Sequence, residues 1–218
     1  MRTSAPQSHL RYPLTLLLSN GGTVRVLRAL AGYGGPLSSS QLARETGLTP
    51  QGVRLVLNGL HSQRLVNVLG AARSQLFSLS EDHPFIAPLR ALFELEQSRW
   101  EHLQQALRKA LKAERSVRSA WLYGSVARGE DGPHSDIDVA LVMDRSAPEA
   151  AERVRQSLLP LEKAQQVTFS VTTVTTEDIS KLPPRDRWWS ELTRDAKVLK
   201  GTGPQQELAR AKNAGRTK

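Results

Sequence analysis

Residues 121–139 read WLYGSVARGEDGPHSDIDV and form the most specific segment of the chain. An apolar strand pattern ends at Tyr123, and Gly124-Ser125 then form a tight turn into a helix. Such a turn presents backbone N–H groups and a serine hydroxyl to an anion. Arg128 follows one helical turn later, within reach of the same phosphate oxygens. The pattern therefore predicts a phosphate-binding turn at Gly124 and Ser125.

Two carboxylates follow this turn. Asp136 and Asp138 are two residues apart on an expected strand over 136–143, so both side chains point to one face. Either feature alone is usually structural, because Gly-Ser turns and solvated Asp-x-Asp pairs are common. Here they occur in order within one strand-turn-helix-turn-strand unit. Together they indicate Mg²⁺- or Mn²⁺-assisted phosphoryl or nucleotidyl transfer, with a nucleoside triphosphate (NTP) as substrate or ligand.

This segment resembles the DNA polymerase β-like nucleotidyltransferase superfamily, specifically its minimal members. The signature is Gly-Ser, Ala-Arg-Gly and Ser-Asp-hydrophobic-Asp, which stands here as Gly124-Ser125, Ala127-Arg128-Gly129 and Ser135-Asp136-Ile137-Asp138. The resemblance implies that Gly124 and Ser125 hold the triphosphate, with Arg128 assisting. It also implies that Asp136 and Asp138 bind the metal and serve catalysis.

One departure from the family concerns a third carboxylate, which active members usually place on a later strand. The corresponding strand here covers 167–174, and its polar face carries no acid; that face consists of Thr168, Ser170 and Thr172. Threonine is no general base at neutral pH. Glu177 and Asp178 follow the strand, at positions that suit helix capping better than metal binding. Since Mg²⁺ often uses one or two protein carboxylates, nucleotide binding is expected to survive this departure better than catalysis.

The front of the chain predicts three helices and a hairpin in about 60 residues. The helices cover 23–33, a short second segment and 50–63, and the hairpin strands cover 65–69 and 75–79. This order, with the turn segment 40–49, resembles the winged helix-turn-helix domains of prokaryotic transcription regulators.

The resemblance implies double-stranded DNA as a partner, read by helix 50–63 in the major groove. Its outward residues are Gln51, Arg54 and Asn58, while Arg64 and the wing residue Arg73 are expected to meet phosphates. A winged helix used for protein contact is the alternative. Residues 1–84 hold 8 basic and 3 acidic groups, a balance that favours DNA.

Charge and composition set the wider limits. The 218 residues carry a net charge of +9 and no cysteine, which excludes disulfides, thiolate zinc sites and cysteine nucleophiles. Residues 116–203 hold 12 basic and 13 acidic groups, and residues 204–218 hold 4 and 1. No apolar run approaches the roughly 20 residues of a membrane span, so no membrane partner is expected. We expect a soluble, cytoplasmic protein.

The sequence predicts an α+β fold with a mixed sheet in its C-terminal domain. Five segments are expected: a polar tail at 1–12, the winged helix-turn-helix domain at 13–84, a connecting amphipathic helix at 85–115, the nucleotidyltransferase-like domain at 116–203 and a basic disordered tail at 204–218. The pair Trp188-Trp189 is expected to pack in the core.

Three functions are compatible with these motifs. The first is a DNA-binding enzyme that transfers a nucleotidyl group from Mg-NTP to a hydroxyl acceptor. The second is a catalytically impaired transcriptional regulator that senses nucleotide or a partner. The third resembles the minimal nucleotidyltransferase antitoxins, with a separately encoded toxin or another protein as partner. A homodimer that forms through the expected helix at 85–115 is also compatible with the sequence.

Overall fold

The computed structural model describes residues 14–71, 74–183 and 185–215. By its internal contacts the chain divides into two compact units, Met1–Ser98 and Arg99–Lys218. The expected polar tail at 1–12 lies outside the described residues. None of the helices within the described ranges is long and apolar enough to cross a bilayer.

The first unit is a winged helix-turn-helix, as the sequence predicted. Its elements are α1 (Leu14–Leu18), α2 (Gly21–Tyr33), β1 (Leu37–Ser38), α3 (Ser39–Thr46), α4 (Pro50–Ser62), β2 (Val66–Leu69), β3 (Leu76–Leu79) and the first part of α5 (Ile86–Ala113). The strands form an antiparallel sheet in the order β1-β3-β2. One apolar cluster joins the helices to the sheet, with Leu27, Leu42 and Leu57 at most 1% exposed.

Capping residues determine where the two helices of the helix-turn-helix begin and where the first of them ends. Ser38 and Gln41 form a capping box at the start of α3, and Gly47 ends that helix in the left-handed conformation (φ +66°). The Thr49 hydroxyl then accepts a hydrogen bond from the Gly52 N–H, with Pro50 in the first turn of α4. These capping interactions begin α4 at Pro50, where the sequence predicts the start of a helix over 50–63.

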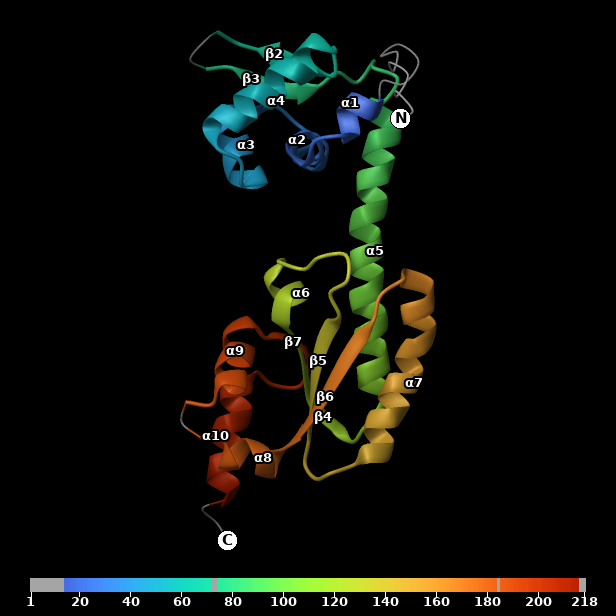
Figure 1. Ribbon diagram of the computed structural model, residues 1–218, viewed down its shortest axis with the longest axis vertical. Coiled ribbons are helices and arrows are strands. Elements are labelled where there is room, and N and C mark those ends of the chain that lie inside the picture. The colour runs from blue at the N-terminus through green and yellow to red at the C-terminus, as the bar shows by residue number, and fades with distance from the viewer. Residues whose placement is uncertain (1–13, 72–73, 184, 216–218) are drawn as a thin grey trace, which may run out of the picture. The chain divides into compact units, whose positions relative to one another are not determined.

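The second unit is a mixed sheet with helices on both faces, which confirms the α+β prediction (Figure 1). Beyond the end of α5, its elements are β4 (Val117–Tyr123), α6 (Gly124–Arg128), β5 (Ile137–Met143), α7 (Pro148–Gln165), β6 (Phe169–Thr175), α8 (Thr176–Lys181), α9 (Arg187–Asp195), β7 (Lys197–Lys200) and α10 (Pro204–Gly215). The strand order is β6-β5-β4-β7. β4 pairs antiparallel with β5 and β7, whereas β5 and β6 are parallel.

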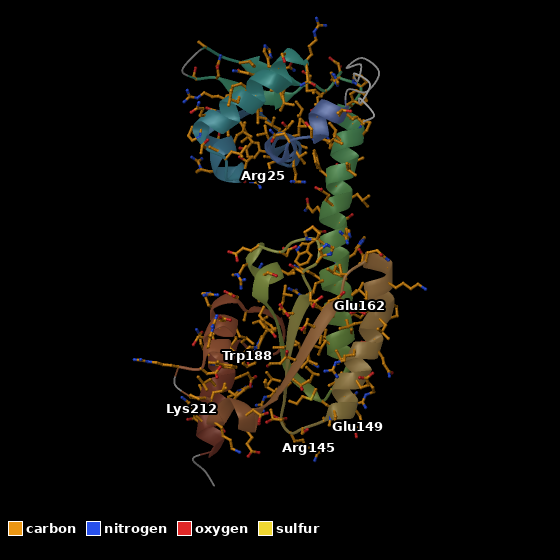
Figure 2. The ribbon with its side chains drawn as sticks, in the orientation of Figure 1. Arg25, Arg145, Glu149, Glu162, Trp188 and Lys212 are labelled. Atoms are coloured by element: carbon orange, nitrogen blue, oxygen red, sulfur yellow. The ribbon has the colours of Figure 1, made fainter. Side chains whose placement is uncertain are left out.

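Each face of the sheet has its own apolar layer. On one face Val139 and Leu141 of β5 pack with α7 and the last part of α5. On the other, Ala140 and Val142 pack with α8, α9 and α10. Trp189 lies edge-on to Trp121, with ring centroids 5.9 Å apart, and the half-buried Trp188 (Figure 2) lies edge-on to Tyr123. Both tryptophans therefore pack in this second layer, as expected.

One of the two outer strands of the sheet, β6, is covered in part by the protein's own side chains. The Phe169 N–H donates to the Glu162 carboxylate at 2.7 Å, and the Val171 carbonyl accepts from Arg155 at 3.1 Å. At the end of the strand, the Thr175 N–H donates to Asp178. Satisfied edge groups oppose pairing with a further strand, so this edge is protected against aggregation.

The prediction of a disordered tail at 204–218 is wrong, because residues 204–215 form helix α10. Glu207 on this helix is fully buried and accepts hydrogen bonds from the Ser119 hydroxyl at 2.7 Å and the Thr202 hydroxyl at 2.5 Å. Arg118 lies 3.5 Å from its other carboxylate oxygen. The tail has few apolar residues, and a local pattern does not reveal that one carboxylate anchors it to β4. Residues 216–218 lie outside the described part.

We therefore expect Glu207→Ala to lower the free energy of unfolding by about 2 kcal/mol, because it leaves the buried Ser119 hydroxyl without its acceptor. Arg210, an exposed partner 3.8 Å from Glu207, provides the control, and Arg210→Ala should change stability by less than about 0.5 kcal/mol. Chemical denaturation measures both. An unchanged midpoint for Glu207→Ala would show that α10 is not anchored in this way.

Candidate functional site

The Gly-Ser turn lies directly against the second aspartate. In the sheet, Tyr123 at the end of β4 pairs with Asp138 near the start of β5. Gly124 follows with φ +76°, and a Cβ atom on it would lie 2.3 Å from the Asp138 Oδ2. Both the left-handed backbone and this close approach require glycine. The turn and the carboxylate are thus brought together as the sequence predicted.

Asp138 is half-buried and Asp136 is exposed, just before the first residue of β5. Burial raises the pKa of Asp138, and the negative charge of Asp136 raises it further. A hydrogen bond with the Ser170 side chain and the positive charge of Arg128 act in the opposite direction. Burial is thus the main cause of the raised pKa, and repulsion by the neighbouring carboxylate adds to it.

Ser170 occupies the position on β6 directly opposite Asp138 in the parallel register. No acid stands on this face of β6, where Thr172 hydrogen-bonds with the Tyr123 hydroxyl at 3.2 Å. Across the described ranges, no three side chains among His, Cys, Asp and Glu gather as a metal site.

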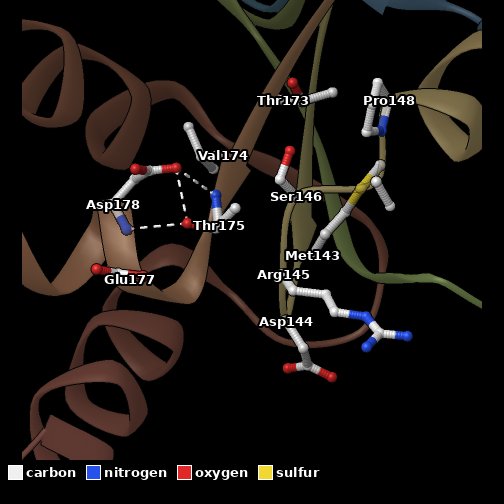
Figure 3. Close-up of a pocket in the computed structure, with 11 residues that line it drawn as sticks. Met143, Asp144, Arg145, Ser146, Pro148, Thr173, Val174, Thr175, Glu177 and Asp178 are labelled. Atoms are coloured by element: carbon white, nitrogen blue, oxygen red, sulfur yellow. Dashed lines mark hydrogen bonds between the residues drawn. The ribbon is translucent and has the colours of Figure 1, made fainter.

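Glu177 and Asp178 do not replace the third carboxylate. Asp178 accepts hydrogen bonds from the N–H and hydroxyl of Thr175 in a capping box, as Figure 3 shows. Thr175 pairs with Met143, five residues along β5 from Asp138. At about 3.3 Å a residue this is on the order of 16 Å. Both acids line a separate pocket of about 450 Å³ at that end of the sheet.

Arg128 is held by two carboxylates. Its Nε donates to Glu130 at 2.6 Å, and one terminal nitrogen donates to Asp195 at 2.5 Å. Asp195 is the last residue of α9, and its side chain is only 4% exposed. No sequence motif marks Asp195, because it lies 67 residues beyond Arg128 along the chain.

These residues fit a divalent cation in part. Two oxygen ligands that share one face suit Mg²⁺ or Mn²⁺, and the raised pKa of Asp138 is what a cation would relieve. The cluster supplies no third carboxylate, so water and nucleotide phosphates would complete the coordination.

The expected DNA-contacting side chains lie on one exposed face of α4. Gln51, Arg54 and Asn58 are all exposed, at the helical spacing that lines one stripe. Leu55 is 67% exposed beside them. Neighbouring apolar residues such as those at 55–57 cannot all face one side of a helix, so Leu55 lies on this exposed face.

Arg64 is also exposed, with a left-handed backbone (φ +59°) between α4 and β2. Arg54 borders a pocket of about 660 Å³ that Ser39, Ser40 and the start of β3 also line. Arg73, the expected wing contact, lies outside the described residues.

The chain contains two types of domain: a helix-turn-helix domain comes first in the sequence, and a nucleotidyltransferase domain follows it. Residues 105–194 match the family model of the nucleotidyltransferase domain, and residues 23–70 match that of the IclR helix-turn-helix domain. The chain carries one domain of each kind, which confirms the resemblance seen in the sequence. A comparison with curated proteins found no match.

Several solved structures are similar over part of the chain. A toxin–antitoxin complex with AMP-PNP is 17% identical, with 52% of this chain and 87% of that chain covered and a TM-score of 0.37. A predicted DNA-binding transcriptional regulator from E. coli is 20% identical, with 41% and 88% covered and a TM-score of 0.33. Lactococcus lactis ZitR in complex with DNA is 18% identical, with 48% and 64% covered and a TM-score of 0.32.

Gly124→Ala should damage the site more than Gly129→Ala. Both glycines have φ near +75°, but a Cβ on Gly129 meets nothing within 4 Å, whereas one on Gly124 collides with Asp138. Backbone strain alone costs about 1–3 kcal/mol, and Gly124→Ala adds displacement of the carboxylate to it. Denaturation and Mn²⁺ titration of both variants measure the difference. Equal losses would show that the Asp138 contact is unimportant.

Arg54→Ala should weaken binding to a selected DNA duplex by about 1–3 kcal/mol and relax sequence preference at one position. Arg108→Ala removes the same charge from an exposed site on α5 and serves as the control. Fluorescence anisotropy at fixed salt compares the two variants with the wild type. Equal affinity of Arg54→Ala and wild type for all duplexes would contradict this placement of the recognition helix.

Proposed function

We propose that this protein is a DNA-binding regulator whose nucleotidyltransferase domain binds a metal–NTP complex and is impaired in the transfer step. The observation that carries this proposal is Ser170, which stands opposite Asp138 where a third carboxylate would complete the metal cluster. Binding and transfer place different demands on the site, and the side chains present support the first better than the second.

The binding role follows from the residues at the end of β4 and the start of β5. Asp136 and Asp138 would hold Mg²⁺, which neutralises phosphate charge and acts as a Lewis acid when bound. Gly124 lets the chain turn close to Asp138, and the Ser125 hydroxyl adds a donor for a phosphate oxygen. Arg128, beside Asp138, contributes positive charge.

Transfer needs a group that accepts the proton of the attacking hydroxyl, and the described residues of β6 that face Asp138 offer no carboxylate for it. Ser170 stands opposite Asp138 on the neighbouring strand, and a serine hydroxyl is no base at neutral pH. Thr172 is engaged with Tyr123. A hydroxyl acceptor near Asp138 therefore meets hydroxyls on β6 instead of a carboxylate.

Nucleotide binding by the second unit would serve to regulate DNA binding by the first unit. Gln51, Arg54 and Asn58 form a face suited to the major groove, and the unit has a basic balance. A domain that binds Mg-NTP without consuming it suits a sensor of nucleotide, with DNA binding as the output.

Calorimetry with each of the four NTPs and Mg²⁺ tests the binding step. The wild type should bind at least one, and Asp138→Asn should weaken that binding at least tenfold by removing one metal ligand. Incubation with the same NTP in labelled form should give little or no transfer to the protein, DNA or lysate components. Absence of binding would overturn the proposal, and rapid transfer would favour the enzyme.

Ser170→Asp offers a gain-of-function test, because it adds the missing carboxylate opposite Asp138. We expect tighter Mn²⁺ binding, measured by electron paramagnetic resonance, together with new transfer activity. Ser170→Asn has the same size without the charge and should show neither. If Ser170→Asp bound Mn²⁺ no better than Ser170→Asn, β6 would not be the site of the missing ligand.

A further inference from the structure

We infer that Asp195 is a positioning residue for the nucleotide site: it holds the guanidinium of Arg128 beside Asp138, ready for a phosphate. The inference rests on the proposed function, since it names how one side chain of that site is placed. Asp195 itself touches neither the metal ligands nor the nucleotide and acts through Arg128.

The contact joins two helices from distant parts of the second unit. Arg128 ends α6, the short helix that follows the Gly-Ser turn, and donates to Asp195 at 2.5 Å. Glu130 accepts from the Nε of the same guanidinium at 2.6 Å. Two carboxylates thus fix two edges of one planar group, which restricts its rotation more than a single pair does.

Asp195 is a rigid anchor for this contact. It is 4% exposed, and α9 is fixed to the sheet by Trp189 and Leu192, of which Leu192 is fully buried. Arg194 also donates to Asp195, at 2.7 Å, and the two arginines lower the pKa of Asp195 to about 2. The carboxylate therefore stays charged at neutral pH, and the long Arg128 side chain is the part that is positioned.

The arrangement leaves Arg128 able to bind a ligand. Among the described residues, its contacts use Nε and one terminal nitrogen, and the second terminal nitrogen donates to no residue. Arg128 ends the short helix α6 that begins at Gly124, and Gly124 lies directly against Asp138, so Arg128 is one helical turn from the candidate metal ligands. A triphosphate bound there would meet an arginine already oriented, which reduces the cost of ordering it.

The experiment compares Asp195→Asn with Glu191→Gln, a matched neutralisation of an exposed carboxylate on the same helix, paired with Arg187. Calorimetry with Mg²⁺ and the NTP that the wild type binds best should show about tenfold weaker binding for Asp195→Asn and no change for Glu191→Gln. Equal affinity of Asp195→Asn and wild type would overturn the inference while leaving the proposed function intact.

A double-mutant cycle with Arg128→Gln separates positioning from a general structural role. If Asp195 acts through Arg128, Asp195→Asn should change affinity by less than about twofold in the Arg128→Gln background. A full tenfold loss in that background would show that Asp195 only supports the fold. If Asp195→Asn does not fold, Asp195→Glu keeps the charge but moves it by one methylene, and it enters the same cycle.

Amide hydrogen exchange without nucleotide gives a readout that does not depend on the proposed function. Exchange over residues 124–130 should be faster in Asp195→Asn than in wild type and unchanged in Glu191→Gln. If the wild type bound no NTP, the proposed function would fail. Unchanged exchange would then independently refute the anchoring of Arg128, and faster exchange would support it.

Discussion

The contact between the Gly124 backbone and the Asp138 carboxylate is the constraint on which the second unit's site depends. β4 must be followed by a left-handed residue so that the chain turns into α6, and β5 must place a carboxylate beside that turn. The gap admits a hydrogen atom but no methyl group. Because the two features are in such close contact, the Gly-Ser turn and the Asp138 carboxylate cannot shift independently.

The sheet explains why the site lies at this end of β5. Along one face of the strand, Val142 and Ala140 are fully buried beneath α8, α9 and α10, and the next residue on that face, Asp138, is only half-buried. Apolar packing therefore stops where the carboxylates begin. The opposite face stays apolar to Ile137, so the strand is held firmly while its polar end meets solvent.

The sequence predicted what depends on neighbouring residues. The Gly-Ser turn and the Asp-x-Asp pair are short patterns with local causes, and the structure places them against each other where β4 ends and β5 begins. Contacts between residues that are far apart in the sequence could not be predicted in this way. Helix α10 is ordered because Glu207 bonds to Ser119, 88 residues away, and Arg128 is placed by Asp195 at a distance of 67. No periodicity encodes such pairings.

Ser170 shows how a lost ligand can be compatible with a stable site. Burial raises the pKa of Asp138, and the negative charge of Asp136 raises it further. A third carboxylate at position 170 would add to that repulsion whenever no cation is bound, whereas a serine donates a hydrogen bond and relieves it. A neutral side chain at position 170 thus lowers the electrostatic cost of the site when no cation is present. That cost is what would decide between the reversible binding proposed for a sensor and a cluster that always holds its cation.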